Sequence, residues 1–71
     1  MAAHRDRFLE LILERIREDR YPSGELMDRA EAAMTRPEHR DAYLDVLLEK
    51  VDETWYPSKQ MLDRIDRLAP A

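Results

Sequence analysis

The sequence predicts an all-α protein in which four short helices form two tandem helical hairpins. Three observations support this fold class. The chain has 71 residues with a single Gly and 39% charged residues, a composition typical of helices. Residues 4–34 align without a gap to residues 39–69, with 12 identical pairs among 31. No stretch shows the apolar–polar alternation that is typical of a β-strand.

The alignment is centred on a Tyr-Pro-Ser stretch that occurs at residues 21–23 and again at 56–58, an offset of 35 residues (56 − 21). We interpret this match as an internal duplication within a single domain, residues 1–71, with repeat one at 4–34 and repeat two at 39–69. The period is close to the roughly 34 residues of tetratricopeptide repeats, but their signature residues are absent. We expect the two hairpins to pack as a small four-helix bundle with an approximate two-fold axis.

The first hairpin is expected to turn at the first Tyr-Pro-Ser stretch. The first helix should cover residues 3–19, where apolar side chains recur at i, i+4 and form one broad stripe. Tyr21 precedes Pro22, and the residue before a proline is disfavoured in the α region, so the helix should end there. Ser23 is the predicted N-cap of the second helix, residues 23–34.

The second hairpin repeats this plan. Thr35 and Glu38 fit the capping-box pattern, which predicts Thr35 as the N-cap of a third helix that ends near Thr54. The second Tyr-Pro-Ser stretch should form the next turn, and a fourth helix should then run to about Leu68, with Pro70 closing it.

Equivalent positions of the two repeats predict which side chains are buried. Leu13 and Leu48 are the same residue in the same register, and both are expected in the core. Tyr21 and Tyr56 are each expected to pack over their hairpin, with the hydroxyl group finding a hydrogen-bond partner.

Acidic side chains recur every fourth residue opposite the apolar stripe of the first and third helices. Like charges at this spacing cost a few tenths of a kcal/mol per pair. These rows are therefore either a solvated face or a site for a basic partner. Arg29 and Arg64, at equivalent positions of the second and fourth helices, are expected to reach them. The candidate partner-binding residues in these rows are Glu10, Glu14, Glu18, Asp45, Glu49 and Glu53.

Trp55 breaks the repeat, because its counterpart is Arg20. One repeat tolerates a charge at this position, so we expect Trp55 to be partly exposed. Trp is enriched among the residues that dominate protein interfaces, which makes Trp55 the best single candidate for a partner contact. The alternative is that Trp55 fills a gap in the core.

No arrangement of residues indicates catalysis, a cofactor or a metal site. The chain has no Cys, which excludes disulfides and thiolate metal ligands. His-Arg-Asp occurs at residues 4–6 and 39–41, but the other protein-kinase motifs are absent. His4 and His39 lack the Glu-x-x-His and His-x-x-x-His spacings of helical metal sites. We therefore expect a protein that is not an enzyme.

The expected function is that of a small helical protein-interaction module or a subunit of a larger assembly. Its partner would be another protein or a second copy of itself, as a homodimer. The alternative is a helix-turn-helix-like nucleic-acid-binding protein whose fourth helix, with Lys59, Arg64 and Arg67, makes the contact. A net charge of −4 works against this alternative. The lack of a long apolar run predicts a cytoplasmic protein without membrane association.

Overall fold

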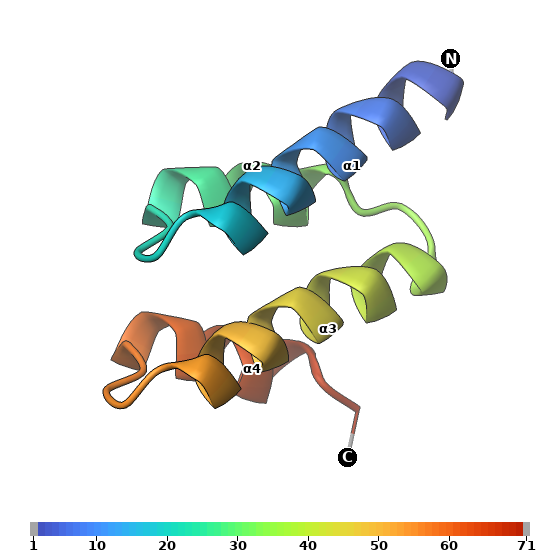
Figure 1. The fold of residues 1–71 in the computed structure, drawn as a ribbon. Coiled ribbons are helices and arrows are strands. Elements are labelled where there is room, and N and C mark those ends of the chain that lie inside the picture. The colour runs from blue at the N-terminus through green and yellow to red at the C-terminus, as the bar shows by residue number, and fades with distance from the viewer. Residues whose placement is uncertain (1, 71) are drawn as a thin grey trace.

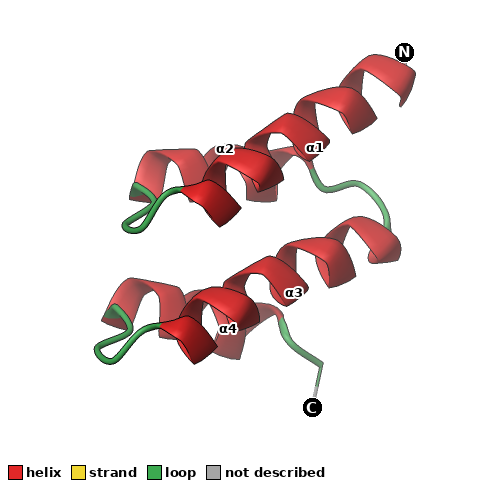
Figure 2. Ribbon diagram, in the orientation of Figure 1, coloured by secondary structure: helices red, strands yellow, loops and turns green. Residues whose placement is uncertain are grey.

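The computed structural model describes residues 2–70, which fold into four α-helices joined by short connections (Figures 1 and 2). Within this range no strand occurs, so the predicted all-α fold is confirmed. The bounds of the third and fourth helices are those of the first and second shifted by 35 residues. The helices are α1 (Ala2–Glu18), α2 (Gly24–Ala33), α3 (Pro37–Glu53) and α4 (Lys59–Leu68).

The two hairpins lie side by side and point in the same direction (Figure 1). α1 packs against α2, α3 packs against α4, and α1 also contacts α3. Both turns lie at one end of the molecule, and both ends of the described chain lie away from them. The contact between α1 and α3 joins the two hairpins.

Both short helices begin with a serine cap. Ser23 Oγ accepts a hydrogen bond from the backbone nitrogen of Leu26 at 3.1 Å. Ser58 Oγ accepts one from the backbone nitrogen of Met61 at 3.0 Å. Each cap satisfies a backbone N–H that has no partner within the helix. The prediction for Ser23 is therefore confirmed, and Ser58 does the same in the second hairpin.

α3 begins differently from the prediction. Its N-cap is Arg36, which makes no side-chain cap hydrogen bond, and Pro37 occupies the first helical turn. The predicted Thr35 cap is wrong, because the helix starts one residue later. Pro lacks an N–H and has a fixed φ, so it suits this position without a capping box. The backbone nitrogen of Thr35 donates instead to His39 Nδ1 at 3.1 Å.

Alanine substitutions should separate these two helix starts. We expect Ser58→Ala to lower the free energy of unfolding by about 0.5–2 kcal/mol, because it leaves the Met61 N–H without its cap. Thr35→Ala should change it by less than about 0.5 kcal/mol, since Thr35 is exposed and precedes the cap. Urea unfolding followed by circular dichroism measures both values. Equal losses in the two variants would show that Thr35 caps α3 after all.

The core lies between α1, α2 and α3 and is closed by α4. Small residues on α2 allow α1 to approach it closely. The core residues are Leu9, Ile12 and Ile16 of α1; Met27, Ala30 and Ala33 of α2; Tyr43, Val46 and Leu47 of α3; and Met61 of α4.

The core prediction is wrong for Leu48. Leu13 is half-buried, but Leu48 is 52% exposed. Val46, Leu47 and Leu48 are consecutive, and successive side chains of a helix point about 100° apart. Val46 and Leu47 are buried, so Leu48 is directed to the outside of the second hairpin.

Candidate protein-interaction surface

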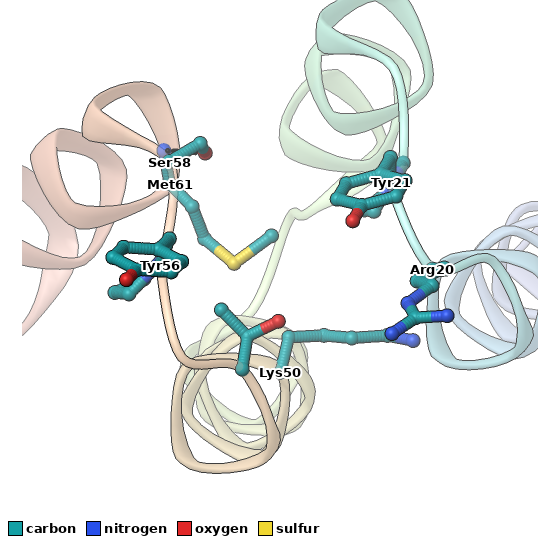
Figure 3. A pocket seen from close by; sticks show the side chains of 9 residues that line it. Arg20, Tyr21, Lys50, Tyr56, Ser58 and Met61 are labelled. Carbon is teal, nitrogen blue, oxygen red and sulfur yellow. Dashed lines mark hydrogen bonds between the residues drawn. The ribbon is translucent and has the colours of Figure 1, made fainter.

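The two Tyr-Pro-Ser turns lie next to each other and enclose a hollow at one end of the molecule (Figure 3). The rings of Tyr21 and Tyr56 lie on its opposite sides, and the sulfur of Met61 points between them. The hollow has a volume of about 180 Å³. Its lining residues are Arg20, Tyr21, Pro22, Lys50, Thr54, Tyr56, Pro57, Ser58 and Met61.

Three aromatic side chains are exposed at this end. Tyr21 is 78% exposed, Trp55 92% and Tyr56 89%. The prediction that the two tyrosines pack over their hairpins is wrong, because each lies in a connection beyond the helix ends, where no element covers it. The expected exposure of Trp55 is confirmed. Exposed aromatic side chains gathered at one place are typical of interaction surfaces.

Lys50 forms the floor of the hollow. It is only 9% exposed, and its Nζ donates to the backbone carbonyl of Asp19 at 2.7 Å. Asp19 directly follows α1, whose carbonyl end favours a positive charge. Lys50 thus ties α3 to the first turn and helps to hold the two turns together. Sequence reasoning missed this role, because the acceptor is a backbone carbonyl 31 residues away in the sequence.

The lining gives the hollow an apolar and adaptable character. The Met61 thioether is flexible and polarizable and makes favourable contacts with aromatic rings. At the rim, the Arg20 guanidinium lies 6.0 Å from the centre of the Tyr21 ring, within the range of a cation–π interaction. The site can therefore hold an apolar group beneath a partly polar rim.

The structure brings together only part of the acidic rows. Glu10 and Glu14 of α1 and Asp45 of α3 line one hollow between these helices, together with Arg17. Glu49 Oε2 lies 3.0 Å from Arg17 Nε, and both side chains are more than half exposed. An exposed pair of this kind contributes at most about 1 kcal/mol.

The two remaining acidic candidates lie elsewhere. Glu18 borders a surface depression beside Leu26. Glu53 borders another beside Trp55 and Tyr56. Glu53 is thus the acidic candidate that shares a surface with Trp55.

Arg64 joins α4 to α2 in a network that the sequence did not predict. Arg64 is 9% exposed, and its Nη2 lies 2.8 Å from Asp28 Oδ1. Its Nη1 donates to Glu31 Oε2. The same carboxylate accepts from the Tyr43 hydroxyl and from Arg67 Nη2, each at 2.6 Å. Arg64 therefore binds the preceding hairpin instead of the acidic row of α3.

The equivalent arginine of the first hairpin has a different environment. Arg29 is exposed and pairs with Glu25 of its own helix, with Nη2 at 3.1 Å from Oε1. The expected contact of Arg29 with the acidic row of α1 is wrong. α2 has a neighbouring hairpin on one side only, and Arg29 lies on the other side.

Protonation of the Arg64 network follows from its contacts. Burial by itself would raise the pKa of Glu31, but hydrogen bonds from Tyr43, Arg67 and Arg64 outweigh it and lower this pKa below its ordinary value. Burial, followed by the hydrogen bond to Glu31, raises the pKa of Tyr43. At neutral pH Glu31 is therefore a carboxylate that accepts hydrogen bonds from three side chains.

Two further properties concern the described part of the chain. Between residues 2 and 70, no three histidine, aspartate or glutamate side chains are grouped so that they could hold a metal ion. The His39 ring contacts Thr35 and Asp6, whereas His4 is exposed. None of the four helices has the length and apolar character needed to cross a membrane.

Comparison of the chain with protein-family models, with curated proteins and with solved structures found no match.

Proposed function

We propose that this protein is a small helical interaction module that binds a partner protein at the end formed by its two turns. One observation carries the proposal: Tyr21, Trp55 and Tyr56 are all more than three-quarters exposed around two adjoining hollows, of which the one between the tyrosines is mostly apolar. Burying these rings against a partner would remove a large apolar area from water. The floor contact of Lys50 with Asp19 supports a site that exists before the partner binds.

The size of the hollow indicates what the partner would insert. An apolar cavity of about 150 Å³ accommodates a benzene-sized group. The hollow of about 180 Å³ therefore suits one leucine- or phenylalanine-sized side chain. Arg20 at the rim and Trp55 in the adjoining depression would then contact the flanking residues of the bound segment.

A peptide selection tests this proposal. The full chain serves as bait for a displayed library of random peptides, and we expect selected peptides to share one large apolar residue. Tyr56→Ala and Trp55→Ala should each weaken their binding about tenfold or more, as is typical of central interface aromatics. Phe8→Ala is the matched control, because Phe8 is an exposed aromatic residue on α1 away from the turns.

Trp55 also provides a direct readout, since it is the single Trp of the chain. Its fluorescence should lie at long wavelength in the free protein and shift to shorter wavelength on peptide binding. Two results together would reject this site. Peptides would bind the Trp55→Ala and Tyr56→Ala variants as tightly as the unmodified protein, and the Trp55 fluorescence of the unmodified protein would not shift on binding.

We infer further that the two hairpins derive from a duplication. The 12 identical residue pairs and the equal offset of all helix bounds support this inference. The contact between α1 and α3 favours tandem stacking of the two units over the two-fold bundle that we expected from the sequence.

The nucleic-acid alternative has less support. Lys59 Nζ lies 2.7 Å from Asp63 Oδ2, and Arg64 and Arg67 both bind Glu31. The basic residues of α4 are thus engaged with carboxylates of the same molecule, whereas a DNA-reading helix presents free basic side chains. The expectations of a cytoplasmic protein without catalytic activity stay predictions.

A further inference from the structure

The hairpins of one molecule meet through two different faces. Hairpin two (α3 and α4) presents what we call the docking face, and hairpin one (α1 and α2) presents the receiving face. The helix bounds of the two hairpins correspond at an offset of 35 residues. A difference in exposure between equivalent positions therefore shows which residues the other hairpin covers. The docking face consists of His39, Tyr43, Val46, Lys50 and Arg64, all buried; the receiving face consists of Asp6, Leu13, Arg17, Met27, Asp28 and Glu31.

Each hairpin also has the equivalent of the other face, on the outer side where no hairpin packs against it. Thirty-five residues before the docking face lie side chains of the same pattern, and all are exposed. Phe8 is 46% exposed where Tyr43 is 0%, and Leu11 is 44% exposed where Val46 is 2%. The outer docking face of hairpin one consists of His4, Phe8, Leu11, Arg15 and Arg29.

The outer receiving face of hairpin two is exposed in the same way. Leu62 is 40% exposed, whereas its counterpart Met27 is 2% exposed. Leu48 is 52% exposed, whereas Leu13 is half-buried. This outer receiving face consists of Asp41, Leu48, Asp52, Leu62, Asp63 and Asp66, all exposed.

These two outer faces account for the exposed apolar residues of the helices. Apart from the three aromatics at the turns, the large hydrophobic side chains that are exposed within residues 4–70 are Phe8, Leu11, Leu48 and Leu62. The first two lie on the outer docking face and the last two on the outer receiving face. Apolar positions of this kind mark surfaces that another molecule covers.

The charges of the two outer faces are complementary. Arg15 and Arg29 accompany the apolar pair on the docking side. Four aspartates accompany the apolar pair on the receiving side: Asp41, Asp52, Asp63 and Asp66. Opposite charges across an interface select the partner and its register. The chemistry of each face thus fits the opposite face of a second copy.

We propose that copies of this protein associate head to tail, so that the hairpin stack continues from one molecule into the next. The internal contacts indicate how the copies would meet. Arg64 binds Asp28 and Glu31, and by the same geometry Arg29 would exchange its surface pair with Glu25 for Asp63 and Asp66 of the next copy, where Asp63 would leave Lys59.

Two more internal contacts carry over to the interface between copies. His39 contacts Asp6 at 3.1 Å, and the equivalent pair is His4 with Asp41 of the next copy. Lys50 donates to the carbonyl of Asp19, and Arg15 is the equivalent donor. The register of the internal interface is thereby preserved.

Other internal contacts do not carry over. Arg67, which binds Glu31, corresponds to Ala32, and Arg36, which binds Asp6, corresponds to Met1. The pair of Arg17 and Glu49 becomes Asp52 opposite Glu14 of the next copy, which is repulsive. Phe8 lacks the hydroxyl with which Tyr43 binds Glu31. The interface between copies is therefore weaker than the internal one, and association is reversible. Because the two faces differ, the assembly extends beyond a dimer.

Sedimentation velocity of the full chain over a concentration series tests the proposal. We expect the average mass to rise with concentration past that of a dimer and to fall with added salt, which screens the charge pairs. Arg29→Glu and Asp66→Arg should each weaken association about tenfold or more. Each variant keeps one intact face, so a mixture of the two should form a 1:1 dimer that grows no further.

Control variants separate this effect from net charge. Arg5→Glu and Glu38→Arg make the same charge changes at exposed positions outside both faces and outside the hollow, and they should associate like the unmodified protein. Asp52→Arg should associate more tightly, because it restores the internal pattern of Arg17 with Glu49. A mass that stops at the dimer, variants that fail to combine on mixing, or an Asp52→Arg variant that stays monomeric throughout the series would overturn the proposal.

Discussion

Alanine in place of Leu47 is expected to lower the free energy of unfolding by about 2–5 kcal/mol, the cost of removing a large side chain from a packed core. Leu47 is 0% exposed and lies in the core between α1, α2 and α3. A domain of 71 residues has a total stability of only about 4–11 kcal/mol on per-residue scaling. The Leu47→Ala change should therefore remove a large share of the total stability.

The neighbouring leucine is the matched control. Leu48 is 52% exposed, and Leu48→Ala should cost less than about 1 kcal/mol. Urea denaturation of both variants, followed by circular dichroism at dilute protein concentration, gives the two free energies. A loss from Leu48→Ala as large as that from Leu47→Ala would mean that α3 is rotated from the orientation described above.

Removal of the Glu31 carboxylate is the second change with a large expected effect. Glu31→Ala should lower the free energy of unfolding by about 3 kcal/mol at neutral pH, the scale of breaking a buried ion pair. The substitution removes the carboxylate to which Arg64 and Tyr43 both donate hydrogen bonds in a mostly buried position. Glu25→Ala on the same helix is the control and should cost about 0.5 kcal/mol, because Glu25 pairs with Arg29 on the surface.

The pH dependence of stability provides a second measure of Glu31. Its pKa is lower in the folded protein than its ordinary value of 4.5. The folded state therefore favours the carboxylate, and this stabilisation is complete above pH 4.5 and is lost as the pH falls through the folded pKa. Unfolding free energies between pH 7 and pH 3 should decline less steeply for Glu31→Gln than for the unmodified protein. Parallel declines would show that Glu31 contributes no such linkage.

Local chemistry explains why much of the fold was predictable. The prolines after Tyr21 and Tyr56 keep the long helices from continuing into the short ones, and Ser23 caps the short helix of the first hairpin. These effects act within a few residues, so the sequence contains all the information they need. The exposure of Trp55 was predicted for a related reason, since its counterpart Arg20 tolerates water.

The parts that could not be predicted depend on how the two hairpins meet. Repeat alignment treats Leu13 and Leu48 as equal, but only Leu13 faces a second hairpin. The same asymmetry buries Arg64 against Glu31 and leaves Arg29 at the surface. The candidate surface at the turns was missed in part, because its floor residue Lys50 binds a carbonyl 31 residues away in sequence.

The position of the termini determines how this protein can be attached to something else. Both ends of the described chain lie away from the turns (Figure 1). A tag, a fluorescent label or a fused domain at either end therefore leaves Tyr21, Trp55 and Tyr56 facing outward. A molecule tethered by its terminus is thus oriented with its aromatic end toward the solution.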